Sequence, residues 1–236
     1  MMQTNENDPP RYLLALETSV PTARVAVLAG DGTVLARTEK TAARHSSNLL
    51  PLCDQALTAA GASVATLGGI ACGAGPGSFT GLRVGLAVAK GLAMPTGIPL
   101  LLVSSLEALA RDLEGPPGAL VVPCIDAGKD QVYARFFGAA SSQEWALEPA
   151  ALAARIAELG KAEVVLGGTG ADRYRALFAA ALGDAAIRAQ VSGPSAVSVG
   201  TLALARLRRG ERDDLDRAVP SYGRPPDITT PKRNRL

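Results

Sequence analysis

The sequence predicts a two-lobed, duplicated α/β fold with mixed sheets. Apolar segments with the character of strands alternate with helical segments along the chain, which is the pattern of α/β proteins. A succession of strand, acidic residue, turn and strand occurs twice, over residues 13–28 and again over 120–137. Glu17 and Asp126 stand in corresponding places of the two copies. Such repetition predicts two similar lobes with a cleft between them.

In the first half, the apolar pattern predicts strands first, then a helix, a glycine-rich loop and a second helix. The expected strands cover residues 12–16, 23–28, 33–37, 67–72 and 98–103. The expected helices cover 46–60, which ends at Gly61, and 80–93, which the Met94-Pro-Thr-Gly97 segment terminates.

In the second half, the strand pattern returns after the Gly-Pro-Pro-Gly break near residue 115. Strands are expected over 120–125, 131–137 and 163–166, a glycine-rich loop over 167–170, and helices over 148–159, 172–182 and 195–209. The resulting division is a disordered lead-in (1–11), a first lobe (12–102), a second lobe (103–220) and an extended basic tail (221–236).

Composition limits the functions that the chain can have. Its 236 residues, 47% of them hydrophobic, can form one large domain or two modest ones. A net charge of +2 provides no broad basic field, so charge does not indicate nucleic acid as a direct partner. His45 is the single histidine, which excludes a two-histidine metal site, and no metal site is predicted.

Cysteine usage and the N-terminal segment indicate the compartment. Cys53, Cys72 and Cys124 are far apart, with no CxxC pair, and are expected to be small buried hydrophobes. The first eleven residues lack the apolar core of a secretory signal. We therefore expect a cytoplasmic protein.

The segment from Gly73 to Gly81 is the strongest local feature. Its glycines permit backbone conformations closed to other residues, and Ser78 or Thr80 can cap the helix that follows. A glycine loop before a helix can bind an anion. The sequence has neither a P-loop ending nor a GxGxxG pattern, so the residues favour a structural turn over a phosphate site.

The helix after this loop carries small residues every four positions, at Gly81, Gly85, Ala89 and Ala93. A stripe of small residues lets another helix approach closely. From the residues alone, packing inside the domain is the favoured interpretation, and a subunit interface is the alternative.

Three further features are candidates for chemistry. Glu17 and Asp126 could act as paired carboxylates across a cleft, although turn hydrogen bonding explains them equally well or better. Gly168 and Gly170 follow a strand and could approach a nucleotide, which is a weak signal. The His45-Ser46-Ser47 segment favours helix capping over catalysis.

Several motifs together resemble one family. They are Leu14-Ala-Leu-Glu-Thr-Ser19, His45 with Leu49-Leu-Pro51, Gly75-Pro-Gly-Ser-Phe-Thr-Gly-Leu-Arg83, Lys90-Gly91-Leu92-Ala93, Ile125-Asp-Ala127 with Val132-Tyr133, and Pro220-Ser-Tyr222. With these motifs the chain resembles the TsaB family, the partner proteins of bacterial tRNA threonylcarbamoyladenosine biosynthesis. The resemblance implies an actin/Hsp70/sugar-kinase type of fold, also described as ribonuclease H-like.

The resemblance also implies a function without catalysis. It implies that the chain has no catalytic residue and no cofactor, binds and stabilises the catalytic subunit TsaD, works with the ATPase TsaE, dimerises when alone, and meets tRNA only through the complex. The implied interface lies on the first-lobe helices: His45, Leu49, Leu50, Ser78, Phe79, Thr80, Gly81, Arg83, Gly85, Ala89, Lys90 and Ala93. Glu17, Asp126, Gly168 and Gly170 would then be remnants of a nucleotide cleft.

The sequence departs from the family pattern at a few places, and other functions stay open. Glu17 stands where Asp is common, which argues against nucleotide binding. Gly128-Lys129 and Gly223 are unusual at their positions. The alternative is an autonomous enzyme, either an ATPase of the actin-like fold or a glycoprotease-type peptidase. A weaker alternative is direct tRNA contact through the tail residues Arg224, Lys232, Arg233 and Arg235.

Overall fold

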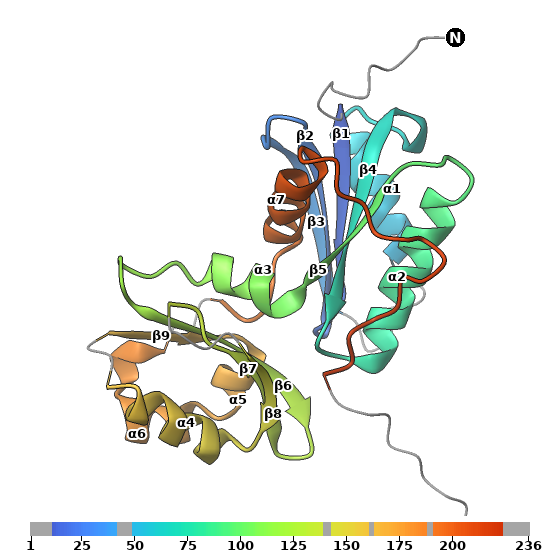
Figure 1. The fold of residues 1–236 in the computed structure, drawn as a ribbon. Coiled ribbons are helices and arrows are strands. Elements are labelled where there is room, and N and C mark those ends of the chain that lie inside the picture. Colours follow the sequence, from blue (N-terminus) through green and yellow to red (C-terminus); the bar gives the residue numbers. More distant parts are fainter. Residues whose placement is uncertain (1–10, 42–48, 139–142, 161–162, 188–190, 224–236) are drawn as a thin grey trace, which may run out of the picture.

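A computed structural model describes residues 11–41, 49–138, 143–160, 163–187 and 191–223 (Figure 1). The chain forms two lobes, each built on one sheet. His45, most of the expected lead-in and the tail beyond Gly223 lie outside these residues.

The first sheet has the strand order β3-β2-β1-β4-β5. Its strands are β1 (Tyr12–Glu17), β2 (Thr22–Ala29), β3 (Val34–Thr41), β4 (Leu67–Gly75) and β5 (Leu100–Ser104). β1 runs antiparallel to β2 and parallel to β4, so the sheet is mixed. Successive side chains of a strand point to opposite faces, and in β1 Leu13 and Ala15 on one face and Leu14 and Leu16 on the other are all buried. The central strands are therefore covered on both sides.

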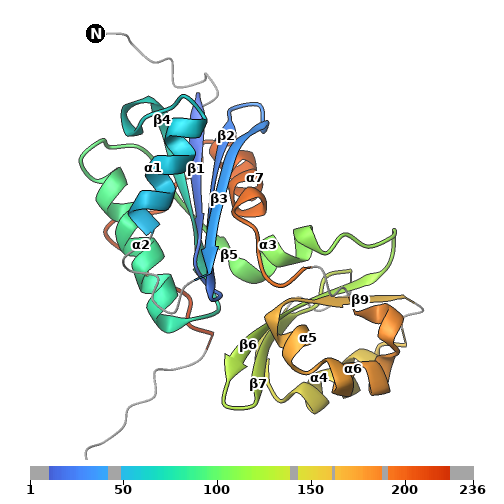
Figure 2. The same ribbon diagram turned by 180° about the vertical axis from the view of Figure 1, so that it is seen from behind.

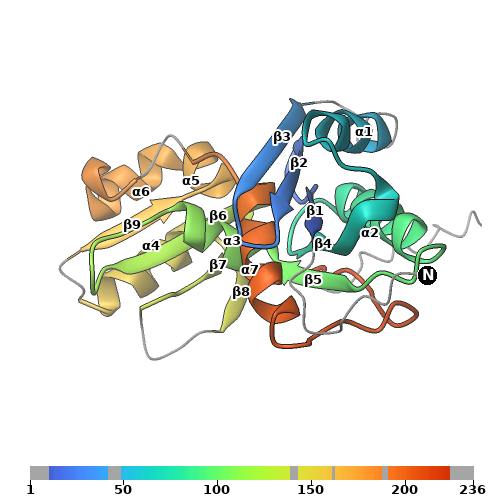
Figure 3. The ribbon, with the colours of Figure 1, turned by 90° about the horizontal axis from the view of Figure 1, so that it is seen from above.

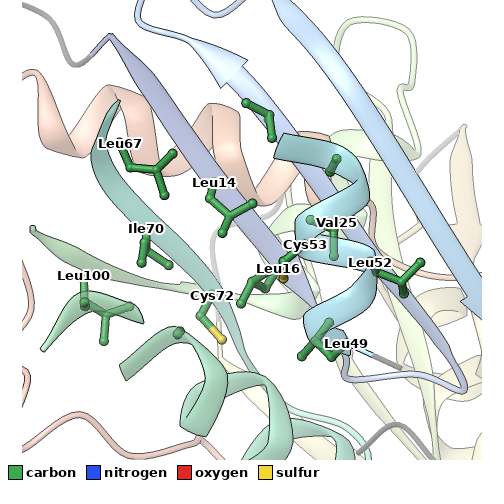
Figure 4. Close-up of a cluster of buried hydrophobic side chains, with 14 of the residues drawn as sticks. Leu14, Leu16, Val25, Leu49, Leu52, Cys53, Leu67, Ile70, Cys72 and Leu100 are labelled. Atoms are coloured by element: carbon green, nitrogen blue, oxygen red, sulfur yellow. The ribbon is translucent and has the colours of Figure 1, made fainter. Parts of the chain in front are cut away.

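Helices cover the two faces of this sheet. Helices α1 (Leu49–Ala59) and α2 (Phe79–Ala93) pack on the face to which Leu14 and Leu16 point (Figure 4). Helix α7 (Ala196–Leu207) packs on the opposite face, against Leu13 and Ala15 (Figure 3). The range 103–220, assigned to the second lobe from the sequence, thus contains a helix that packs in the first lobe. Without α7, the apolar face of β1 and β2 would be exposed to solvent. The sequence pattern of α7 does not reveal which of the two sheets the helix covers.

The second sheet repeats the first. Its strands are β6 (Leu120–Gly128), β7 (Gln131–Arg135), β8 (Glu144–Leu147) and β9 (Val164–Gly167). The order β8-β7-β6-β9 corresponds to β3-β2-β1-β4. β6 is antiparallel to β7 and parallel to β9, as β1 is to β2 and β4. The predicted two-lobed, duplicated α/β fold with mixed sheets is confirmed.

Helices also cover the second sheet. α4 (Pro149–Glu158), α5 (Thr169–Arg173) and α6 (Arg175–Leu182) pack on one face of it. By chain order α4 corresponds to α1, and α5 with α6 corresponds to α2. The chain also forms two short 3-10 helices, Val64–Thr66 and Asp184–Ala186.

The two lobes share a hydrophobic cluster. Helix α3 (Ser105–Asp112) follows β5 and brings Leu106 and Leu109 against the second sheet. Val20, just after β1, packs into the same cluster with Ile125 and Tyr133 of the second sheet. Apolar side chains therefore fill the space where the lobes meet.

Some elements differ from the expectation. Helix α3 and strand β8 were not predicted. The expected loop over 167–170 is wrong in its second half, because α5 begins at Thr169 with Gly168 as its N-cap. The single helix expected over 172–182 divides at Tyr174, whose backbone φ of −108° departs from helical geometry. Over the described residues, none of the helices has the length and apolar character required to cross a membrane.

Candidate functional site

Glu17, the first predicted cleft residue, is fully buried at the end of β1. Its carboxylate accepts a hydrogen bond from the backbone N–H of Ser19 at 2.5 Å and one from the Ser105 hydroxyl at 2.9 Å. Burial raises the pKa of the Glu17 carboxyl above its ordinary value. The Glu17 carboxylate thus links the end of β1 to the start of α3, and residues of the same chain enclose it.

The glycine-rich loop before α2 is filled by its own chain. A Cβ added at Gly73 would lie 2.1 Å from a Glu17 carboxylate oxygen, and one at Gly77 would lie 2.3 Å from the Ser19 carbonyl oxygen. Ser78 caps α2, because its hydroxyl accepts a hydrogen bond from the Gly81 N–H at 3.2 Å. These contacts support the structural turn that the residues favoured over a phosphate site.

Asp126, the second predicted cleft residue, takes part in a local network of the second lobe. Its carboxylate accepts hydrogen bonds from Arg173 at 2.9 Å and from the Gly128 N–H at 3.0 Å, and its own N–H donates to the Thr169 hydroxyl at 3.0 Å. Asp126 and Glu17 share no hydrogen-bond partner among the described residues. The structure thus gives the two acids separate surroundings.

Gly168 and Gly170 serve close packing. A Cβ at Gly168 would lie 2.4 Å from the Cys124 carbonyl oxygen, and one at Gly170 would lie 2.7 Å from Cys124 Sγ. Both glycines are buried and let α5 approach β6. Within the part of the chain that the structure describes, no group of three or more His, Cys, Asp or Glu side chains is placed to hold a metal ion.

The small-residue stripe of α2, predicted to face a partner, faces the inside of its own lobe. Gly81, Gly85, Ala89 and Ala93 are all buried within the single chain. The Thr18 hydroxyl donates to the Gly81 carbonyl at 2.8 Å, and a Cβ at Gly85 would lie 2.3 Å from the Thr18 hydroxyl oxygen. The close approach that the stripe permits is therefore made by the turn after β1.

The opposite side of α2 is exposed and also carries small residues. Thr80, Ala87 and Gly91 share this side, because spacings of seven and four residues return to the same helical face. Leu50 of α1 is 56% exposed and Leu49 is buried. Figure 2 shows α1 and α2 side by side on the first lobe, away from the second lobe. Their outward sides, with Leu50, Asp54, Thr80, Ala87 and Gly91, are called the α1/α2 face below.

The C-terminal strap, residues 213–223, borders this face. It passes from the edge of β5 across α2, as the orange-red segment in Figure 1. The Asp213 N–H donates to the Leu100 carbonyl at 2.9 Å, and Lys90 Nζ donates to the Asp216 carbonyl at 3.5 Å. Arg83 Nε donates to the Tyr222 hydroxyl at 3.0 Å. Arg83 and Lys90, predicted as partner contacts, thus already contact the strap.

Sequence reasoning missed several residues of this region. Ser105, Thr18 and Tyr222 were not predicted as contacts of Glu17, Gly85 and Arg83. Ala87 and Gly91 could have been found, because they repeat small side chains on the other side of the same helix. The contact between Tyr222 and Arg83 joins residues 139 positions apart, and the sequence carries no signal for it.

Comparison with known proteins identifies the family. A family model described as "TsaD: tRNA N6-adenosine threonylcarbamoyltransferase" matches residues 37–224, which is well over half of the chain. The chain belongs to the TsaD family.

Within the TsaD family, the resemblance to TsaB proteins is confirmed. The chain is 38% identical over 122 residues to the Escherichia coli protein named tRNA threonylcarbamoyladenosine biosynthesis protein TsaB, over 51% of this chain and 52% of that protein. It therefore spans about half the length of this curated relative. An uncharacterised Mycobacterium tuberculosis protein is 34% identical over 170 residues, which is 71% of this chain and 75% of that protein.

A solved structure extends the similarity to nearly the whole fold. A Pseudomonas aeruginosa protein, described as uncharacterised with similarity to peptidase YEAZ, superposes with a TM-score of 0.76 and 31% identity. The superposition covers 90% of this chain and 99% of that chain. Both lobes of this TsaD-family chain therefore have a counterpart in that structure.

Proposed function

We propose that this chain is a non-catalytic subunit of the tRNA threonylcarbamoyladenosine machinery, which binds and stabilises TsaD through the α1/α2 face. It forms a homodimer when TsaD is absent, joins the ATPase TsaE in a larger complex, and meets tRNA only through that complex. The observation that carries the proposal is the exposed small-residue side of α2 next to the exposed Leu50, in a chain with TsaB relatives.

The α1/α2 face has the physical character of a helix-packing surface. Its small side chains at Thr80, Ala87 and Gly91 allow the backbone of another helix to approach closely. Leu50 and Met94, which is 64% exposed, add apolar area at its edges. A partner helix pair would bury these side chains. Removing their apolar surface from water is favourable, and in the free chain this surface stays exposed.

The surroundings of the predicted cleft support a role without catalysis. A nucleotide or metal would need an accessible acid, and Glu17 is enclosed by Ser19, Gly73 and Ser105. The apolar cluster of α3 and Val20 occupies the contact between the lobes. These observations weigh against the autonomous ATPase, and no arrangement among the described residues favours a peptidase.

The proposal is tested by substituting Gly91 with arginine. A Cβ at Gly91 meets no atom within 4 Å, so Gly91→Arg places a bulky cation on the α1/α2 face without a collision inside the chain. We expect the wild-type chain to co-purify with TsaD and Gly91→Arg to lose the complex without any fall in Tm. Gly85→Leu would be unsuitable, because it would collide with Thr18 and disturb the fold.

Ala176→Arg, at an exposed position of α6, is the matched control and should keep the complex. Size-exclusion chromatography with mass measurement of the intact complex provides the readout. Survival of the complex with both Gly91→Arg and Ala87→Arg would show that the α1/α2 face is not the interface.

A further inference from the structure

Two aromatic side chains and an arginine form an exposed cluster where the strap meets α2. The rings of Phe79 and Tyr222 have centroids 4.8 Å apart, and the Arg83 guanidinium lies 4.2 Å from the centroid of the Phe79 ring. Arg83 Nε donates to the Tyr222 hydroxyl at 3.0 Å. Each of the three side chains thus contacts the other two.

The cluster is accessible. Phe79, the first residue of α2, is 46% exposed, and Arg83 is exposed one turn later. No acidic side chain among the described residues forms an ion pair with Arg83. Aromatic residues and arginine are enriched at protein interfaces, and tyrosine and arginine are among the types that dominate their binding energy.

The strap holds Tyr222 firmly in this place. The Ser221 N–H donates to the Ala74 carbonyl at 2.7 Å. Gly75 and Gly223 let the chain approach closely, because a Cβ at Gly75 would lie 2.3 Å from the Ser221 carbonyl oxygen and one at Gly223 would lie 2.6 Å from the Tyr133 ring. Tyr222 thus lies between a backbone hydrogen bond at Ser221 and close packing at Gly223, and neither contact involves Phe79 or Arg83.

We infer that Tyr222 is a positioning residue, which holds Phe79 and Arg83 as a ready-formed anchor for TsaD at the border of the α1/α2 face. The inference rests on the proposed function and adds the strap to the surface that TsaD contacts. The cluster lies on the first turn of the same helix that carries Thr80 and Ala87, so one partner can cover both.

Preorganisation is the physical effect of Tyr222. Without the Tyr222 ring and hydroxyl, the long Arg83 side chain and the exposed Phe79 ring would sample several rotamers in the free protein. Binding would then have to order both side chains. We expect this lost conformational freedom to weaken the affinity about tenfold.

The experiment measures the Kd for TsaD of the wild-type chain, of four variants of the cluster and of one control variant. We expect Tyr222→Ala to weaken binding about tenfold, and Tyr222→Phe, which keeps the ring and loses the hydroxyl, to recover most of the affinity. Tyr222→Ala should weaken binding less in an Arg83→Ala background than in the wild type, since Tyr222 acts in part through Arg83. Tm is measured for each variant and should remain that of the wild type.

Arg155→Ala is the matched control, because Arg155 makes a comparable contact in the second lobe, 5.2 Å from the centroid of the Trp145 ring. It should leave the affinity unchanged. If the wild-type chain does not bind TsaD, the proposed function fails and this inference fails with it. If the wild type binds and Tyr222→Ala binds equally well, or weakens only self-association, the proposed function stands and the role of Tyr222 is refuted.

Discussion

At the scale of single residues, Glu17 and Asp126 show that the same sequence pattern can occur in two different environments. Glu17 and Asp126 both follow a central strand, yet Glu17 is fully buried and Asp126 pairs with Arg173 at the surface. The difference comes from residues far away in sequence, since Gly73 and Ser105 enclose Glu17. The positions of both acids could be predicted from the sequence, but their accessibility could not.

The buried carboxyl predicts a pH dependence of stability. Burial raises the pKa of Glu17 above its ordinary value of 4.5, so the folded chain binds a proton at this site more tightly than the unfolded chain. The stability from this group is complete below pH 4.5 and falls as the pH rises toward the folded pKa. The Glu17→Gln variant should not lose stability in this way as the pH rises, because its amide cannot ionise.

Urea unfolding of wild type and Glu17→Gln between pH 4.5 and 8 measures this effect. The free energy of unfolding of the variant, relative to wild type, should increase as the pH rises. Other titrating groups contribute equally to both proteins and cancel in the difference. Parallel curves across the whole range would show that Glu17 does not carry the predicted linkage.

At the scale of elements, helix α2 carries small residues on two sides that differ only in what packs against them. Gly85 lies against Thr18, whereas a Cβ at Gly91 meets nothing. The four-residue spacing by itself favoured packing inside the domain, and the family resemblance implied that this side faces a partner. Spacing reports which residues share a face and does not report which face the rest of the chain covers.

The two glycines therefore predict opposite effects of the same substitution. Gly85→Ala should lower the free energy of unfolding by about 1–3 kcal/mol, because its Cβ displaces Thr18 and disturbs the hydrogen bond to Gly81. Gly91→Ala should raise it by about 0.5–1 kcal/mol through helix propensity alone. Chemical denaturation at neutral pH compares the two variants with wild type. Equal effects would mean that the inward packing of Gly85 is misassigned.

Most elements could be predicted because their apolar period is long and clear, as in β1 and α2. Strand β8 has only four residues and becomes a strand through pairing with β7. Helix α3 has only eight residues, too short for its pattern to stand out between a strand and a Gly-Pro break. The place of α7 depends on contacts across about 180 residues, which periodicity does not encode.

At the scale of the whole molecule, duplication produces two similar sheets joined by an apolar contact. Leu109 of α3 is fully buried in the cluster that includes Val20 of the first lobe and Ile125 of the second. A hydrophobic contact of this kind couples the stability of one lobe to that of the other. The lobes should consequently unfold together, although each has its own sheet and its own core.

Leu109→Ala tests this coupling. Removing a buried leucine side chain should lower the free energy of unfolding by about 2–5 kcal/mol. Trp145, the one tryptophan of the chain, lies on β8 and reports on the second lobe, while far-ultraviolet circular dichroism reports on both lobes. In wild type and variant alike, the two signals should change at the same denaturant concentration. Separate transitions in the wild type would mean that the α3 cluster does not couple the two lobes. If Leu109→Ala changed only the tryptophan signal, the contribution of Leu109 to stability would be limited to the second lobe.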